Sequence, residues 1–318
     1  MKRALWWTSP ALAAALISAP LLVAQGGART PDGRPDLQGM WLNDTATPLE
    51  RPLASAAKAS LTDAEARDYE ARYQLDRTVA NSRSPEFELK AAGDLDTYEP
   101  GRLLPGNRTG MITDPPDGRV PALTPEAQAR LNAQTERIRT RHGENPENLT
   151  NGERCLLVGN TSLPPMLPAF YNNIVQIVQT RDYVVILSEM IHDARIVPLD
   201  RRAHLPAGIG QWKGDSIGHW EGDTLIVDTT NFTDKTAFRG ASPRLHVVER
   251  FSLSDRNTLR YQFTLEDPSS FARSWSGESA MSRTASQMFE YACHEANYSL
   301  PAVLRGERLA EQNNATNK

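Results

Sequence analysis

The sequence predicts an α+β protein, mainly β, whose core is an antiparallel β-barrel with a helical and irregular insertion after the first strand. Three observations lead to this fold class. From residue 173 onward, short runs rich in Val and Ile follow one another, and turn signals separate them without any helix pattern in between. That order is typical of a meander that closes into a barrel or a sandwich. Residues 44–150 instead combine helix-start signals with Pro- and Gly-rich connections, so we assign them to the insertion.

The N-terminus has the pattern of a signal peptide, predicted to span residues 1–24. Lys2 and Arg3 precede a short apolar run at 11–23, and small residues around Ala24 would permit cleavage. The run is shorter than the roughly 20 apolar residues of a comfortable membrane span, which makes an uncleaved anchor the weaker alternative. We therefore expect a periplasmic or secreted protein with no membrane contact after signal cleavage.

Composition excludes some partners. The 318 residues carry 35 basic and 39 acidic side chains, a net charge of −4, and contain no block of Lys and Arg. Nucleic acids and anionic membrane surfaces are therefore poor candidates, and a small-molecule ligand or substrate is the expected partner. The length fits one or at most two domains, and nothing in the sequence indicates the oligomeric state.

Local sequence signals predict the structure of the segments outside the main strands. Residues 25–36 are rich in Gly, Pro, Asp and Arg and form an exposed lead-in to a single domain at 37–310. A helix is predicted from about residue 61 to 75, because acids follow a capping residue there. A second helix is predicted to end at Arg141, with Thr124 as its cap and Pro125 at its first position. Residues 311–318 are predicted to be a disordered tail.

The main strands are expected within residues 151–300. Residues 212–232 predict a β-hairpin, since Gly222 and Asp223 supply the backbone angles of a tight turn. Alternation of apolar and polar residues at 259–266 indicates a strand with one wet face. The other strands are placed at 174–179, 183–191, 194–199, 225–230, 245–251 and 289–293. The predicted core consists of Trp41, Val185, Leu187, Leu225, Val227, Val247, Phe251, Tyr261, Phe263 and Tyr291.

The chain has two cysteines, Cys155 and Cys293. In an oxidising compartment, an isolated pair is more often a disulfide than two free thiols. The bridge would join the start of the C-terminal half to its last strand, expected at 289–293, and would close a long loop. A catalytic cysteine is the weaker alternative, because neither residue precedes a helix start that would lower its pKa.

Several motifs resemble a known group of sequences. They are PDLQGMW at 35–41, TPLERP at 47–52, GDSIGHWEGDTL at 214–225, LHVVER at 245–250 and EYAC at 290–293. Together they resemble a large set of uncharacterised secreted bacterial proteins over nearly all of the mature chain. This resemblance implies a secreted location and a single structural unit. The Gly39-x-Trp41 opening is also similar to lipocalin-like β-barrels, which implies a pocket but no chemistry.

Residues 189–195 hold the strongest polar candidates, at the junction of two apolar strands. His192 would be the general base or acid, and Asp193 would orient it. Arg195 would stabilise developing charge or grip a carboxylate. His219 would be a second proton-transfer group. A structural alternative is equally simple, because His-Asp is a common turn pair and Arg195 could bridge to Glu189.

Other side chains are candidates for ligand contact. Two indoles beside an imidazole could stack on a flat ligand at a pocket mouth, although such residues are more often core. The predicted ligand-binding residues are Tyr171, Asn173, Glu189, Trp212, Trp220 and His246.

Two further kinds of site are weaker. Gly214-x-Ser216-x-Gly218 has the spelling of a nucleophile elbow, but a hairpin rather than a helix follows it. Six histidines are scattered without metal-binding spacing, so no metal is expected. The leading hypothesis is a cofactor-independent acid–base enzyme, an isomerase, lyase or hydrolase, acting on a small and partly apolar molecule. A non-catalytic small-molecule carrier is the first alternative, and a serine hydrolase that uses Ser216 is the second.

Overall fold

The computed structural model describes residues 28–55, 58–82, 101–169, 171–200, 202–236, 238–295 and 297–316, with only the backbone at 77–82. The predicted signal peptide lies outside these residues. None of the helices in the described ranges is long and apolar enough to cross a membrane.

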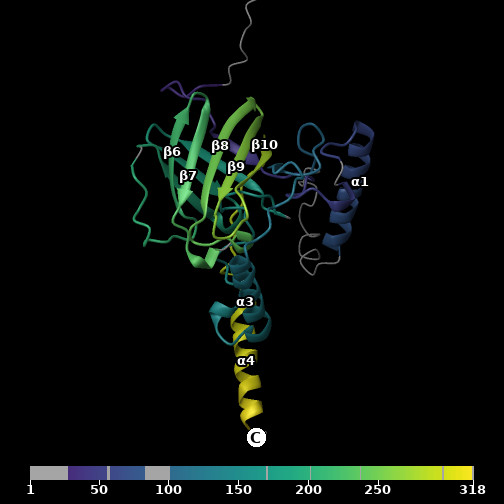
Figure 1. Ribbon diagram of the computed structural model, residues 1–318, viewed down its shortest axis with the longest axis vertical. Helices are drawn as coiled ribbons and strands as arrows, with labels where there is room; N and C mark the ends of the chain where they lie inside the picture. The colour runs from purple at the N-terminus through teal and green to yellow at the C-terminus, as the bar shows by residue number, and fades with distance from the viewer. Residues whose placement is uncertain are drawn as a thin grey trace, which may run out of the picture.

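Ten strands of the described chain form one antiparallel sheet (Figure 1). Along a path of nine strands the order is β5-β4-β3-β1-β10-β9-β8-β7-β6, and β2 pairs with β10. Strands β5 and β6, at the two ends of this path, lie next to each other and nearly close the barrel. The predicted fold class is therefore confirmed. The strands are β1 (Gly39–Leu42), β2 (Ile112–Asp114), β3 (Ile174–Gln179), β4 (Tyr183–Ser188), β5 (Asp193–Pro198), β6 (Asp215–Glu221), β7 (Thr224–Thr230), β8 (His246–Asp255), β9 (Thr258–Glu266) and β10 (Trp275–Arg283).

Strand β1 completes the barrel, as the sequence predicted. Its Trp41 pairs with Val175 of β3 on one side and with Arg283 of β10 on the other. The indole is fully buried, and its Nε1 donates a hydrogen bond to the carbonyl of Leu37 at 2.9 Å. The Arg283 guanidinium lies 4.2 Å from the ring centroid, a cation–π contact. Trp41 thus ties together two strands that are far apart in sequence.

Aromatic rings occupy the barrel interior. Phe263 packs edge-on against Trp275 with ring centroids 6.0 Å apart, and Tyr261 lies beside it at 5.8 Å. Gly277 faces Phe263 across the strand pair, and a Cβ there would stand 2.3 Å from the ring. The interior at this level is therefore a close-packed core rather than an open space.

One predicted strand is wrong, and one strand was not predicted. The chain at 289–293 forms loops and turns, and the strand that follows β9 is instead β10. Its sequence, WSGESAMSR, alternates buried and partly buried residues, but small Gly, Ser and Ala side chains conceal that pattern. Strand formation here depends on pairing with β9 rather than on intrinsic preference.

The predicted core needs three corrections. Val185 and Leu187 are only partly buried. Val184, which precedes them, and Ile186, which lies between them, are buried instead. The strand is a continuous apolar run, so the sequence does not reveal which face points inward, and a shift of one residue reverses the faces. Tyr291 is also only partly buried, because its segment is not a strand. The other seven predicted core residues are buried.

Three α-helices lie in the described chain: α1 (Asp63–Ser82), α3 (Pro125–Arg141) and α4 (Ser299–Thr316). Thr124 caps α3 as predicted, since its hydroxyl accepts a hydrogen bond from the Ala127 amide. Helix α1 stands beside the barrel, while α3 and α4 extend from one end of it (Figure 1). Helix α4 runs through most of the segment that was predicted to be a disordered tail. Short 3₁₀ helices occupy Leu53–Ser55, Pro146–Asn148, Met190–His192, Asp234–Thr236 and Phe238–Gly240.

The predicted disulfide between Cys155 and Cys293 is present. It joins the loop that precedes β3 to the segment between β10 and α4, across 138 residues of sequence. The bridge therefore fixes the C-terminal segment to the loops at one end of the barrel.

Candidate functional site

A pocket of about 790 Å³, here called the apolar pocket, lies between the insertion and the loops at one end of the barrel. Its size falls within the range of small-molecule sites. Both halves of the domain contribute to it, since its lining comes from the segment after β1, from α1 and α3, and from loops before β3 and after β7. The lining residues are Thr45, Ala46, Thr47, Pro48, Leu49, Tyr69, Tyr73, Met111, Gln134, Asn151, Gly152, Leu157, Gly159, Asn160, Leu163, Leu167, Pro168, Ala169, Lys235, Thr236, Phe238 and Arg239.

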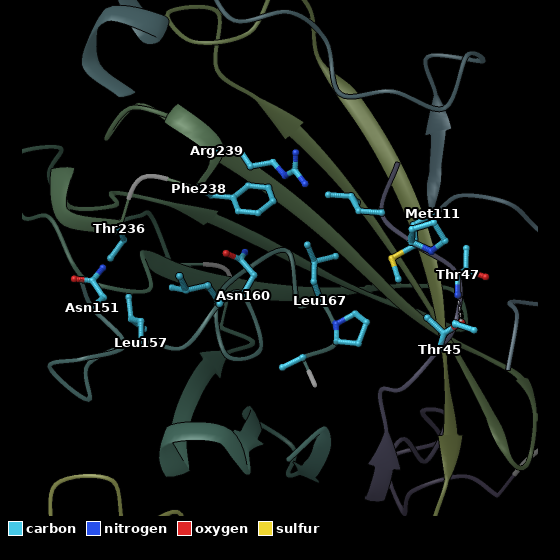
Figure 2. Close-up of a pocket in the computed structure, with 18 of the residues that line it drawn as sticks. Thr45, Thr47, Met111, Asn151, Leu157, Asn160, Leu167, Thr236, Phe238 and Arg239 are labelled. Atoms are coloured by element: carbon cyan, nitrogen blue, oxygen red, sulfur yellow. Dashed lines mark hydrogen bonds between the residues drawn. The ribbon is translucent and has the colours of Figure 1, made fainter. Parts of the chain in front are cut away.

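One wall of the apolar pocket rests on the barrel core. Leu49, Leu167 and Phe238 are partly buried and pack against the core cluster. The ring of Phe238 stacks on Trp275 with centroids 6.3 Å apart. In Figure 2, Phe238 and Arg239 lie on one side of the pocket, and Thr45, Thr47 and Met111 lie on another. This wall is therefore positioned by the rigid part of the fold.

The insertion supplies the opposite wall. The hydroxyl of Tyr69 on α1 lies 3.4 Å from the carbonyl of Ala46, and burial raises its pKa. The Thr45 hydroxyl donates to the carbonyl of Arg102 at 2.6 Å, and the Thr47 hydroxyl donates to the carbonyl of Arg108 at 3.1 Å. Because these threonine hydroxyls are already engaged by the backbone, they hold the wall in place.

The apolar pocket has few polar groups, and the charged side chains among them are all positive. Lys235 and Arg239 line it, and its described lining residues include no carboxylate, histidine, serine or cysteine. Arg239 reaches Glu50, with Nη1 and Oε2 3.4 Å apart. The amide of Asn160 donates to the carbonyl of Pro165 at 2.9 Å. Such a lining can bind and orient a ligand.

The first group of predicted site residues lies around the C-terminal segment. Glu189 is buried and accepts hydrogen bonds from the amides of Ile174 and Phe289. His192 is exposed, and its Nδ1 lies 2.9 Å from the carbonyl oxygen of Tyr291. Tyr171 stacks on Tyr291 at 6.5 Å. The structure therefore brings these three predicted residues together at the segment 289–291, and their contacts hold that segment against the barrel.

The other residues of the predicted catalytic group have separate partners. Asp193 forms an ion pair with Lys213 rather than orienting His192. Arg195 points into the barrel and pairs with Glu249, with Nη1 and Oε2 2.6 Å apart. His219 lies on β6 and is partly buried, and its Nε2 lies 3.2 Å from Oε1 of Glu221.

The remaining ligand-binding candidates are also dispersed. Asn173 bonds both the amide and the carbonyl of Ala169 through its side chain. Trp220 packs on the barrel core, with the Arg34 guanidinium 5.9 Å from its ring centroid. Trp212 is partly buried in the turn before β6. None of the predicted catalytic or ligand-binding residues lines the apolar pocket.

A cluster of titratable side chains lies on the outer face of β6, β7 and β8. His204 bridges two carboxylates, since its Nδ1 and Nε2 lie 3.0 Å from Asp215 and Asp228 respectively. His246 Nε2 also lies 3.0 Å from Asp228, and its Nδ1 lies 3.4 Å from Glu266. The hydrogen bond to Asp228 raises the pKa of His246 despite partial burial. The cluster fastens the segment after β5 to the outside of the sheet.

Asp215 is the most strongly bound member of that outer cluster. Although burial opposes its charge, hydrogen bonds from Arg202, the Leu205 amide and His204 lower its pKa to about 2. A carboxylate held in this way stays charged over the physiological range, and it serves as a fixed acceptor rather than as a proton donor. No group of three or more residues that could hold a metal ion occurs within the described ranges.

Ser216 has the surroundings of a structural residue. It is buried within β6, and its hydroxyl shares a 2.8 Å hydrogen bond with that of Thr229 on β7. Gly214 has a φ of +71°, and a Cβ there would meet the carbonyl oxygen of Thr230 at 2.6 Å. A Cβ at Gly218 would meet Val197 at 2.8 Å, where β6 approaches β5. The two glycines of the motif are therefore explained by close approaches in the barrel.

The residues of the apolar pocket were missed by sequence reasoning. Most of them come from loops without regular periodicity, and three-dimensional packing brings these loops together with α1 and α3. A local signal did exist in the Pro- and Leu-rich stretches TPLERP at 47–52 and LPPMLP at 163–168. Apolar side chains in loops that cannot form strands or helices are candidates for the lining of a pocket.

Comparisons with known proteins add no assignment to this geometry. The chain matches no model of a protein family, and no curated protein sequence is detectably similar to it.

Proposed function

We propose that this protein binds a small, mainly apolar molecule in the apolar pocket and acts as a carrier or binding protein. The observation that carries the proposal is the pocket itself, about 790 Å³ in volume, with a lining dominated by Leu, Pro, Ala, Met and aromatic side chains. Sites of this size with a few convergent polar groups are typical of small-molecule binding.

Binding is favoured over catalysis by the chemistry of the lining. Acid–base catalysis needs a titratable group within hydrogen-bond reach of the ligand. His192 contacts Tyr291, and His204 and His246 contact carboxylates on the outer face of the barrel. The groups that reach the apolar pocket are amides, hydroxyls and two cations, which can orient a ligand through hydrogen bonds.

The proposal includes an extracytoplasmic location, either periplasmic or secreted. The disulfide between Cys155 and Cys293 supports it, because such bonds persist mainly in oxidising compartments. The signal-like pattern of the first 24 residues supports it independently. A carrier in that location would collect its ligand outside the cytoplasm.

The test combines ligand retention with a pocket-filling variant. Native mass spectrometry of the protein purified from its own host should show excess mass that denaturation removes. Titration with the neutral apolar fluorophore N-phenyl-1-naphthylamine should show saturable binding, weakened by Leu167→Trp because Leu167 lines the pocket. Leu309→Trp on α4 adds the same bulk at an exposed position and should bind normally. Equal binding by both variants would locate the ligand elsewhere and refute the proposal.

An acid–base enzyme is the second candidate, and the backbone at His192 favours it. Ile191 and His192 have φ values of 65° and 44°, a conformation that non-glycine residues rarely adopt and that is often found at functional sites. His192→Ala should then abolish turnover of a screened substrate without changing the fold. Turnover at the normal rate in that variant would remove His192 from any mechanism.

A further inference from the structure

A second hollow, here called the basic hollow, adjoins the apolar pocket. Its volume is about 670 Å³, and it lies between α3 and the loops at 147–154 and 234–243. Gln134, Asn151 and Lys235 line both spaces. A ligand in the apolar pocket could therefore extend past these three residues into the basic hollow.

The basic hollow has an excess of positive charge. Arg130, Arg137, Arg154 and Lys235 line it, against the carboxylates Glu147 and Asp234. Arg130 is engaged, because its Nη2 donates to the Ser270 hydroxyl at 2.8 Å and to the carbonyl of Gly240 at 3.3 Å. The other three cations are the ones that remain for a ligand.

The side-chain charges of Arg137, Arg154 and Lys235 have no hydrogen bond or ion pair with any residue in the part of the chain that the structure describes. Other arginines of the same region are paired, such as Arg139 with Glu136 at 2.6 Å and Arg141 with Glu144 at 2.7 Å. Three cations from three different segments thus line one hollow, and none of them pairs with a carboxylate of the described residues. Guanidinium groups bind carboxylates and phosphates in paired hydrogen bonds, which suits them to an anionic group.

We propose that the ligand is an amphipathic anion, whose apolar body occupies the apolar pocket and whose anionic head lies in the basic hollow near Arg137, Arg154 and Lys235. This inference rests on the proposed function, because the apolar body is the molecule proposed there. The shared chemistry is an acidic head on an apolar body, which an alkyl or an aromatic acid supplies equally well.

Matched pairs of probes test the charge of the head. Decanoate and 1-decanol share an alkyl body, and 2-naphthoate and 2-naphthylmethanol share an aromatic one. Isothermal titration calorimetry at low salt should show that at least one anion binds about tenfold or more tightly than its neutral partner, since charge-assisted hydrogen bonds exceed neutral ones in strength. The pair with the larger preference identifies the body as alkyl or aromatic.

Variants test where the head binds. The double variant Arg137→Gln, Arg154→Gln should reduce the preference for the anion to about threefold or less. It should leave the affinity for the neutral partner unchanged, because these two residues line the basic hollow and not the apolar pocket. Arg139→Gln is the matched control, because it removes a positive charge from the same helix but outside the lining. It should keep the full preference. Circular dichroism of each variant confirms the fold before titration.

The outcomes separate the two proposals. Equal binding of the anionic and neutral partners would overturn the anionic head and leave the apolar-pocket proposal intact. A preference that the double variant retains would overturn the basic hollow as the site of the head. If none of the four probes binds, and N-phenyl-1-naphthylamine does not bind either, the proposed function fails and this inference fails with it.

Discussion

Arg195 and Glu249 form a two-pronged ion pair inside the barrel, with Nη1–Oε2 and Nη2–Oε1 distances of 2.6 and 2.9 Å. Arg195 is on β5, at one end of the strand path, and Glu249 is on β8, so the pair links non-adjacent strands across the interior. The Tyr261 hydroxyl donates to Glu249 at 2.8 Å and accepts from the Met166 amide at 2.8 Å. Burial opposes the charge of Arg195, but Glu249 outweighs that effect and raises its pKa.

Substituting only one partner of this ion pair should lower the free energy of unfolding considerably. Arg195→Met leaves the Glu249 carboxylate buried without its counter-charge, and we expect a loss of about 3–5 kcal/mol in the free energy of unfolding. The double variant Arg195→Met, Glu249→Leu should lose less, because neither charge remains buried. Urea unfolding measures both. Glu136→Gln, which breaks an exposed pair on α3, is the control and should change stability little. A single variant as stable as the parent would show that the pair does not support the barrel.

Much of the barrel was accessible from the sequence because local signals and tertiary packing agree there. Trp41 was placed in the first strand and in the core, and it is fully buried between β3 and β10. The turn at Gly222 and Asp223 joins β6 and β7 as predicted, and Gly222 has a φ of +57°. The cap at Thr124 and the disulfide were also predicted correctly. Each of these depends on a few residues with distinctive chemistry.

The predictions from the sequence were wrong where the pattern of side chains does not show which way a side chain points. The run 183–187 is apolar on both faces, so Val184 and Val185 could not be told apart. Arg195 was predicted to act on a ligand, whereas its partner, Glu249, is 54 residues away in the chain. The apolar pocket was not predicted, because Tyr69, Asn160 and Phe238 come from three segments whose arrangement depends on the completed fold.

The packing of Phe263 against Gly277 predicts a sharp effect of one added methyl group. A Cβ at Gly277 would stand 2.3 and 2.7 Å from two ring atoms of Phe263, inside the core. Gly277→Ala should therefore destabilise the protein by about 1–3 kcal/mol through overpacking. Gly208→Ala is the matched control, because a Cβ there would have no neighbour within 4 Å. Thermal unfolding measures both, and equal melting temperatures would contradict the close packing described for this level of the barrel.

The outer cluster predicts a dependence of stability on pH. The hydrogen bond to Asp228 is the main cause that raises the pKa of His246 in the folded state. The protonated imidazole therefore contributes stability that is complete below its unfolded pKa of about 6.5 and is lost as the pH rises through the higher folded pKa. Proton NMR should show a titration of His246 above that value, and Asp228→Asn should shift it downward. Asp223→Asn, which removes a carboxylate bound to Arg29, should leave it unchanged. A His246 pKa that is the same in the parent and in Asp228→Asn would contradict the assignment.

The disulfide predicts a dependence of stability on redox conditions. Cys155 and Cys293 are separated by 138 residues, and closing so long a loop restricts the unfolded chain more than the folded one. In the chain-entropy model, reduction should lower the free energy of unfolding by about 4–5 kcal/mol. Urea unfolding with and without dithiothreitol measures the difference. The double variant Cys155→Ala, Cys293→Ala should match the reduced protein in stability and should not respond to dithiothreitol. If reduction leaves the parent unchanged, then the loops before β3 and the C-terminal segment are held together by their other contacts, such as the Glu189 carboxylate with the Phe289 amide.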